Sequence, residues 1–301
     1  MVLLVISIQL GLLYAIMAMG VYTTFRILNI PDLTVDGSFA LGMAVSAVLT
    51  ISGHPILALL AAIIVGAMAG GITGFLQTKV GIHPILAGIL VMTGLYTVNL
   101  AIMGGKSNLS VAGKETLFTK WETLIVTQNG LGKTILTLIS SIIVLMILVI
   151  IFKTKMGLAI RATGDNEEMV RSSSINANIT KCIGLAIGNA CVALSGALFC
   201  QHQMYSDVGF GSGMVVSGLA SVIIGEAIFG RRSVTIGFLS ALVGSVIYRI
   251  MIALALKFNV FPSYSLKLVS AVIVAIALSM PAIAASIKKS KLRREAKSHL
   301  N

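Results

Sequence analysis

The chain consists of apolar runs long enough to cross a lipid bilayer, interrupted by one long charged segment. A helix needs about 20 apolar residues to span the hydrocarbon core. On that measure the sequence predicts about nine spans: 2–25, 34–52, 55–77, 84–104, 134–152, 179–201, 213–229, 234–256 and 267–287. Only 11% of the residues are charged, whereas soluble domains carry about 25%. We therefore expect an all-α, polytopic transmembrane helical bundle of about 8–10 spans, with residues 1–301 forming a single domain.

Two of the predicted spans, 34–52 and 213–229, are short, and each follows a loop that contains Asp and Gly. The loops lie in two stretches that share a weak pattern, PDLTVDGSFALGMAV from Pro31 and SDVGFGSGMVVSGLA from Ser206. Broken helices in matching positions on opposite sides of the membrane are typical of inverted-repeat transporters. The identity of the two stretches is low, so chance similarity is an equally good interpretation.

The distribution of Lys and Arg predicts the orientation. Most of the 22 basic residues fall on one side of the predicted bundle, in the 153–181 segment, the tail 288–301 and the short connections that contain Arg26, Lys79, Arg231 and Arg232. The positive-inside rule makes this side cytoplasmic and puts the N-terminus outside. The tail is expected to bind anionic lipid headgroups. The net charge of +12 thus reflects topology, and no nucleic-acid-binding module is recognisable.

The charged segment reads KTKMGLAIRATGDNEEMVRSSSINANITK from Lys153 to Lys181. Gly164 is expected to break the chain, and Asp165 to cap a new helix with Glu168 at its third position. Arg171 has the right charge for the last turn. Because two to eight residues are enough to connect two helices, a stiff charged helix over about 164–174 indicates a surface that another protein grips.

The sharpest short motif is Asp36-Gly37-Ser38-Phe39, at the start of the second span. Asp36 is expected to cap that span, while Gly37 and Ser38 allow the backbone to bend or to approach another helix. The N-terminus of a half-helix beside a transport pathway can also hold a charged group. An ordinary helix start beside a packing glycine explains the motif equally well.

Two further charges fall inside predicted spans, Glu226 in the seventh and Arg249 in the eighth. An ionisable residue within the membrane is a functional candidate, although the long side chain of Arg249 can also extend to the outer surface. Together with the four residues of the 36–39 motif they form the predicted pathway set. So few acids weigh against a carrier driven by protons or sodium.

Signals of enzyme chemistry are missing. Residues 127–134, TQNGLGKT, are close to a phosphate-binding loop, but Thr127 replaces the first glycine and no strand precedes it. The four histidines are scattered, and neither a zinc-hydrolase nor a serine-hydrolase motif occurs. Cys182, Cys191 and Cys200 are interpreted as apolar filler. We expect no metal, no cofactor and no catalytic residue.

The segment from Gly157, GLAIRATGDNEEMVRSSSINANITKCIGLAIGNACVALSGALF, resembles ABC importer permeases of the branched-chain amino-acid and ribose type. The resemblance implies a type II ABC importer-like fold, with the charged segment as the cytoplasmic coupling helix. Ser174 stands where that family usually has glycine, and Arg231 and Arg232 replace small residues. The implied coupling residues are Gly157, Arg161, Ala162, Gly164, Asp165, Asn166, Glu167, Glu168, Met169 and Arg171.

The start NIPDLTVDGSF resembles one branch of that superfamily, which is found with lipoprotein-type receptors and linked to uptake of amino acids, including aromatic ones. The implied partners are two copies of a cytoplasmic ABC ATPase, an extracellular or periplasmic substrate-binding protein and a second permease chain. The implied location is the bacterial cytoplasmic membrane. The alternatives are a secondary carrier or channel that needs no ATPase and, less favoured, a membrane-embedded enzyme.

Overall fold

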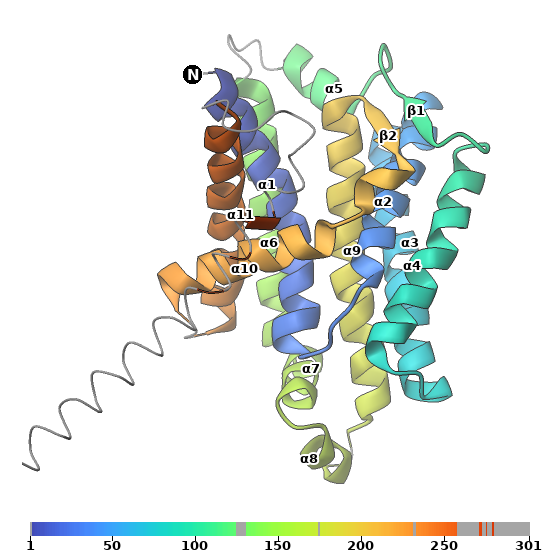
Figure 1. Cartoon of the computed structure of the whole chain (residues 1–301), viewed down its shortest axis with the longest axis vertical. Helices are drawn as coiled ribbons and strands as arrows, with labels where there is room; N and C mark the ends of the chain where they lie inside the picture. Colours follow the sequence, from blue (N-terminus) through green and yellow to red (C-terminus); the bar gives the residue numbers. More distant parts are fainter. Residues whose placement is uncertain are drawn as a thin grey trace, which may run out of the picture.

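A computed structural model describes residues 2–124, 131–173, 175–230 and 233–257, together with residues 271, 272, 275 and 279. Within these ranges, eight helical segments are long and apolar enough to cross a membrane (Figure 1). They are α1 (Val2–Tyr22) with the π-helical turn η1 (Thr23–Ile27), α2 (Thr34–Ile51), α3 (Pro55–Phe75) with η2 (Leu76–Val80), α4 (Pro84–Ile102), α6 (Leu131–Lys153), α9 (Ala177–Gln203), α10 (Met214–Phe229) with the preceding 3-10 turn η4 (Val208–Gly211), and α11 (Val234–Lys257). The all-α transmembrane prediction is confirmed. The predicted ninth span, 267–287, lies almost wholly outside the described residues, and the tail 288–301 lies entirely outside them.

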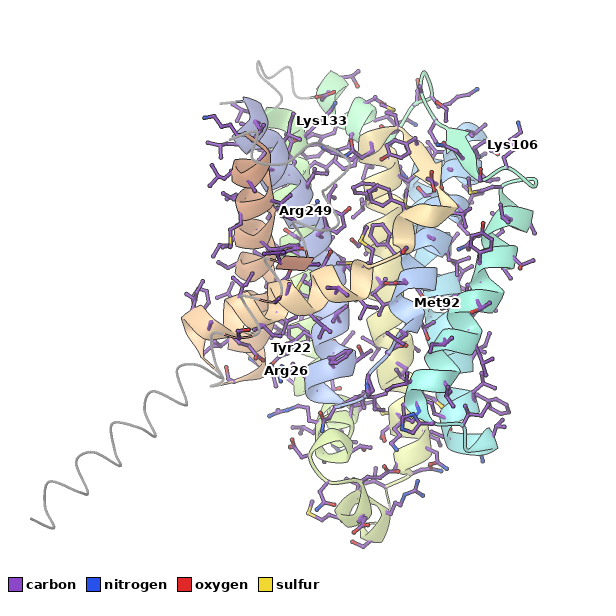
Figure 2. The ribbon with its side chains drawn as sticks, in the orientation of Figure 1. Tyr22, Arg26, Met92, Lys106, Lys133 and Arg249 are labelled. Atoms are coloured by element: carbon purple, nitrogen blue, oxygen red, sulfur yellow. The ribbon has the colours of Figure 1, made fainter. Side chains whose placement is uncertain are left out.

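Short elements cover the two ends of the bundle. At the end that holds the N-terminus, β1 (Asn108–Ser110) pairs antiparallel with β2 (Tyr205–Asp207), and α5 (Leu117–Leu124) lies nearby (Figure 1). At the opposite end lie α7 (Lys155–Asp165) and α8 (Glu167–Ser172). In Figure 2, Lys106 and Lys133 lie toward the first end and Arg26 lies toward the second. The charged segment and the β1–α5 region are therefore on opposite ends of the molecule.

Helix α9 is the centre of the bundle, because α1, α2 and α3 all pack against it. Small residues permit this contact. A Cβ atom at Gly42 of α2 would overlap the carbonyl oxygen of Ala193 in α9, and close backbone approach through small residues is the usual way that membrane helices pack. By contrast, α3, α4 and α6 expose large apolar side chains, such as Ile64, Leu90 and Ile150. Such faces suit contact with lipid tails.

The two short spans begin partway along the bundle. Figure 1 shows the segment before α2 rising from the lower end of α1 to the middle of the molecule, where α2 starts. The segment after β2 descends through a 3-10 turn, η4 (Val208–Gly211), before α10 begins and runs obliquely across α1. Irregular backbone at this depth is tolerated in a membrane protein where protein surrounds it or where it lines a cavity.

Candidate functional site

The charged segment folds into two short helices, and the prediction that Asp165 caps the second of them was wrong. Thr154 caps α7, its Oγ1 accepting a hydrogen bond from the Gly157 N–H at 3.3 Å. Asn166, not Asp165, caps α8, its Oδ1 accepting from the Met169 N–H at 3.0 Å. Glu168 is therefore the second residue of α8 and not the third, so it makes no capping box. Asn and Asp are equally good caps, so residue type alone did not distinguish the two positions.

Gly164 does not break the chain either, since it lies within α7. A Cβ atom there would overlap the carbonyl oxygen of Ile27, the last residue of η1. Gly157 similarly lies against the carbonyl oxygen of Ile151 at the end of α6. The glycines of this segment are required by close backbone contact, and they seat α7 directly on the ends of two membrane helices.

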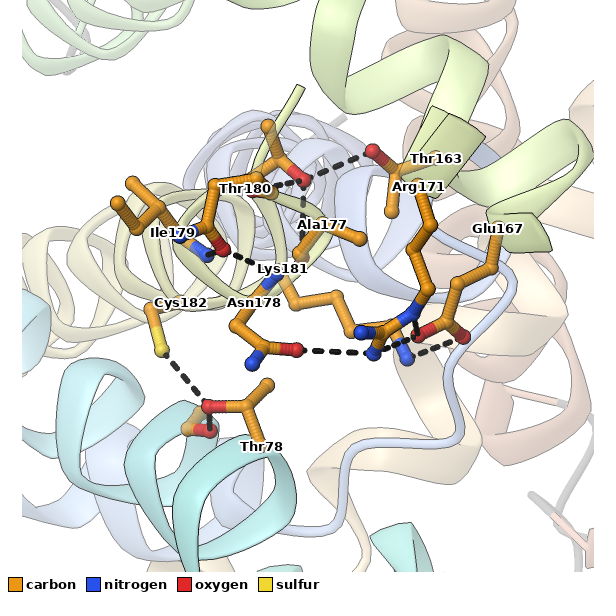
Figure 3. A network of polar contacts seen from close by, with 12 residues as sticks. Thr78, Thr163, Glu167, Arg171, Ala177, Asn178, Ile179, Thr180, Lys181 and Cys182 are labelled. Atoms are coloured by element: carbon orange, nitrogen blue, oxygen red, sulfur yellow. Dashed lines mark hydrogen bonds and ion pairs between the residues drawn. The ribbon is translucent and has the colours of Figure 1, made fainter. Parts of the chain in front are cut away.

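Glu167 fastens α8 to the start of α9 (Figure 3). Its carboxylate accepts hydrogen bonds from Lys181 and, at 2.8 Å, from Arg171. Arg171 also donates to Oδ1 of Asn178 at 3.0 Å. The hydrogen bond from Lys181 lowers the pKa of the Glu167 carboxyl, and Arg171 lowers it further. A lowered carboxyl pKa means that this network stabilises the fold above the ordinary pKa and is lost as the pH falls through the lowered value.

The remaining residues of the segment divide into a packed set and an outward set. Val170 is buried, and Arg161 and Ala162 are half-buried on α7. Asp165 and Glu168 are exposed, and Met169 is 57% exposed. An apolar side chain flanked by acids at the tip of the molecule is a small contact surface. Ser174 lies outside the described residues.

Asp36 was expected to cap its own helix, and instead it caps the other short span. Its Oδ2 accepts a hydrogen bond from the Gly213 N–H at 2.9 Å, and its Oδ1 accepts from the Val215 N–H at 2.8 Å. These are N–H groups at the start of α10, where the helix dipole favours a negative charge. At α2, the Thr34 N–H donates to Asp32 at 2.9 Å. The two stretches that share the weak sequence pattern therefore meet at mid-depth.

A pocket of about 320 Å³ opens beside this contact. Its lining comes from α2, α4 and the segment that leads into α10: Asp36, Gly37, Ala40, Met92, Thr93, Tyr96, Asn99, Val208, Gly209 and Ser212. Figure 2 shows Met92 about midway along α4. The pocket therefore lies well inside the thickness of the bundle.

Only part of the predicted pathway set lines this pocket. Asp36 and Gly37 do. Ser38 is buried and donates to Oδ1 of Asn189 at 2.7 Å, whereas Phe39 is buried and stacks on Tyr14 with ring centroids 5.8 Å apart. Both serve the packing of α2.

Glu226 and Arg249 lie elsewhere in the bundle. Glu226 accepts from Arg26 at 2.6 Å, which ties α10 to η1. The Arg249 guanidinium lies 3.7 Å from the centroid of the Tyr14 ring, a cation–π contact. Neither residue lines the pocket.

Sequence reasoning missed the contribution of α4. Met92, Thr93, Tyr96 and Asn99 supply one wall of the pocket. One signal was available, because Asn99 is a carboxamide within a long apolar run. Lys181, which holds Glu167, was also not singled out. In the described ranges no group of three or more His, Cys, Asp or Glu side chains is placed to hold a metal ion.

Comparison with known proteins gives a consistent result. The family model described as "Branched-chain amino acid transport system / permease component" matches residues 3–277. A tyrosine transport system permease protein from Clostridioides difficile (strain R20291) is 37% identical over 285 residues, which cover 94% of this chain and 92% of the relative. The ribose import permease protein RbsC from Escherichia coli (strain K12) is 28% identical over 213 residues, 70% of this chain and 65% of the relative.

The fold also matches a solved structure. PsaBC from Streptococcus pneumoniae in complex with Fab aligns with a TM-score of 0.53, covering 90% of this chain and 89% of that one. The sequence identity is 16%, so this likeness concerns the fold alone.

Proposed function

The chain belongs to the family of branched-chain amino acid transport system permease components and is a multi-pass membrane subunit of an ABC importer; from that premise we propose that its substrate is an amino acid, with aromatic amino acids as the first candidates. The observation that carries the choice of substrate is the 37% identity, over nearly the whole length of both chains, to a permease named for tyrosine transport. The protein performs no covalent chemistry. It provides the route, and a partner ATPase provides the energy.

In this proposal α8 is the coupling helix. A groove on the ATPase receives the exposed Met169, with Asp165 and Glu168 beside it. Movement of α8 passes to α9 through the Glu167–Lys181 ion pair, and movement of α7 passes to α1 through the close contact of Gly164 with Ile27. Helix α9 packs on α2, whose first turn borders the pocket. This chain of contacts supports a direct mechanical link from the coupling helix to the pathway.

The same proposal implies a subunit composition for the transporter. In an ABC transporter two ATPase subunits close on each other, and each ATPase subunit transmits its movement through one coupling helix. The described part of this chain offers one such helix, α8, so we propose that two permease chains, most simply two copies of this one, pair with two ATPases. An extracellular receptor delivers the amino acid.

Uptake tests the function. The permease, its ATPase and its receptor are reconstituted in proteoliposomes, and uptake of radiolabelled L-tyrosine, L-leucine and ribose is measured with and without ATP. We expect ATP-dependent accumulation of at least one amino acid and none of ribose. Accumulation of the amino acid at the same rate without ATP would indicate a secondary carrier, and accumulation of ribose alone would refute the assignment to amino acids.

Labelling tests the orientation, in which the charged segment and the C-terminus face the cytoplasm. Ser173, after α8, and Ser110, in β1, are both exposed and lie at opposite ends of the bundle. A cysteine at Ser173 should react with a membrane-impermeant maleimide only in inside-out vesicles, and one at Ser110 only in intact cells. The opposite result at either position would reverse the orientation and remove α8 from the reach of the ATPase.

A further inference from the structure

Two residues with oxygen acceptors, Asp36 on α2 and Asn99 on α4, line the pocket between α2, α4 and the 208–212 segment. The Asp36 carboxylate accepts backbone N–H groups at the start of α10, among them those of Gly213 and Val215, and it retains acceptor capacity, since a carboxylate offers about four acceptor positions. Asn99, which is 1% exposed, lines the same pocket. Its Nδ2 donates to the Gly37 carbonyl oxygen at 3.4 Å. Within the described residues, its Oδ1 has no hydrogen-bond partner.

A buried acceptor without a donor is costly, because it gives up its hydrogen bond to water and gains none in exchange. A donor that entered the pocket would satisfy Asn99 and would at the same time approach the charge of Asp36. No Lys or Arg is among the described side chains that line the pocket. The site therefore lacks a cation of its own.

Apart from the hydroxyl groups of Thr93 and Ser212, most of the remaining lining is apolar or aromatic. Ala40, Met92 and Val208 contribute apolar surface, and Tyr96, which is 52% exposed, contributes an aromatic ring. A volume of about 320 Å³ falls at the small end of the range for ligand sites, about 300–1,000 Å³. The pocket thus combines oxygen acceptors with a surface that suits an apolar or aromatic group.

We propose that this pocket is a transit site for the solute and that it binds the solute's ammonium group between the Asp36 carboxylate and the Asn99 carbonyl oxygen. The apolar side chain of the solute lies against Met92, Val208 and the Tyr96 ring. The proposal rests on amino-acid import as the function and adds which group of the amino acid the permease itself recognises. It also disfavours an anion that carries no ammonium group, because Asp36 already occupies the start of α10 and nothing in such a ligand would offset its repulsion.

The test measures protection of a cysteine in the pocket. Thr93 lines the pocket and is exposed, so Thr93→Cys should react with a small maleimide. The reaction is followed on the importer complex in nanodiscs, without ATP, and the background from the native cysteines is subtracted using the same complex with Thr93 unchanged. The probes are L-tyrosine, tyramine, which lacks the carboxylate, 3-(4-hydroxyphenyl)propionate, which lacks the amine, and ribose.

We expect L-tyrosine and tyramine to slow the labelling, and 3-(4-hydroxyphenyl)propionate and ribose to leave it unchanged at the same concentration. Asn99→Leu removes the acceptor at nearly constant volume and should raise the tyramine concentration for half-protection by about tenfold. The control is Thr97→Val, an exposed position on the same helix that does not line the pocket, and it should leave protection unchanged. If Asn99→Leu fails to fold, Asn99→Asp keeps an acceptor and should strengthen protection by tyramine.

Several results would overturn the site. They are protection by no probe, protection by the amine-free acid or by ribose equal to that by tyramine, and protection unaffected by both Asn99 variants. Because labelling needs neither ATP nor the receptor, this result is independent of the uptake assay. If the protein imports L-tyrosine but no probe protects Thr93→Cys, the proposed function stands and the proposed binding site is wrong. If tyramine protects Thr93→Cys but no amino acid is imported, the binding site stands and the proposed function is wrong.

Discussion

Replacing Glu168 by Lys together with Met169 by Asp is expected to abolish ATP-driven uptake while the membrane spans stay folded. Both side chains are exposed at the tip of α8, so the double variant removes one apolar contact and reverses one charge without touching the bundle core. A positive side chain in the first turn also opposes the helix dipole. A misplaced charge at an interface costs about 3 kcal/mol, or roughly a hundredfold in affinity.

The measurements are the amount of permease in the membrane, the amount of ATPase that purifies with it, and uptake normalised to the permease. The matched control is Glu115→Lys, the same charge reversal at the opposite end of the molecule, where the Glu115 side chain is 78% exposed. It should leave all three at the wild-type level. If the double variant also takes up substrate and retains ATPase normally, α8 is only a connector between two spans.

Replacing Gly164 by Ala is expected to destabilise the protein and to uncouple ATP hydrolysis from transport. On helix propensity alone, Gly→Ala inside a helix stabilises by about 0.5–1 kcal/mol. At Gly164 the added methyl would overlap the Ile27 carbonyl oxygen, and overpacking of this kind costs about 1–3 kcal/mol. The clash dominates, and α7 must move away from the end of η1.

The control is Gly71→Ala in α3, where, apart from the adjacent backbone of α3 itself, no atom of the described residues lies within 4 Å of the new methyl. The two variants should shift the melting temperature of the detergent-purified complex in opposite directions, downward for Gly164 and upward or not at all for Gly71. Only the Gly164 variant should lose substrate-stimulated ATPase activity. A Gly164→Ala protein that melts at or above the wild-type temperature would show that α7 is not held tightly against η1.

The spans were predictable because they depend only on the length of consecutive apolar sequence. Crossing a bilayer demands a certain length of apolar sequence, and the 213–229 and 234–256 predictions agree with α10 and α11 to within about one residue. The position of the charged segment between two spans was equally readable. The division of that segment into α7 and α8 was not, because Gly164 looked like a helix breaker. Its true role, room for the backbone of Ile27, is a property of the packed structure.

The candidate pathway was only partly predictable for the same reason. The 36–39 motif drew attention to Asp36, but its partners, Gly213 and Val215, lie 177 and 179 positions away. No local sequence pattern predicts a contact between residues so far apart in the chain. The wall formed by α4 was missed because, apart from Asn99, its residues are apolar or only weakly polar, and which face of a largely apolar helix borders a cavity depends on its neighbours.

The contact of Asp36 with α10 has a consequence for biogenesis. Ribosomes deliver α2 to the membrane long before α10 exists, and the partner of the nearby Ser38, Asn189, is also 151 positions away. The nascent α2 therefore enters the bilayer with a carboxylate that has no permanent partner, a costly arrangement inside hydrocarbon. The final position of α2 depends on α9 and α10, which are synthesised later. The first half of this chain can be threaded through the membrane, but it is completed only when the second half is synthesised and docks against it.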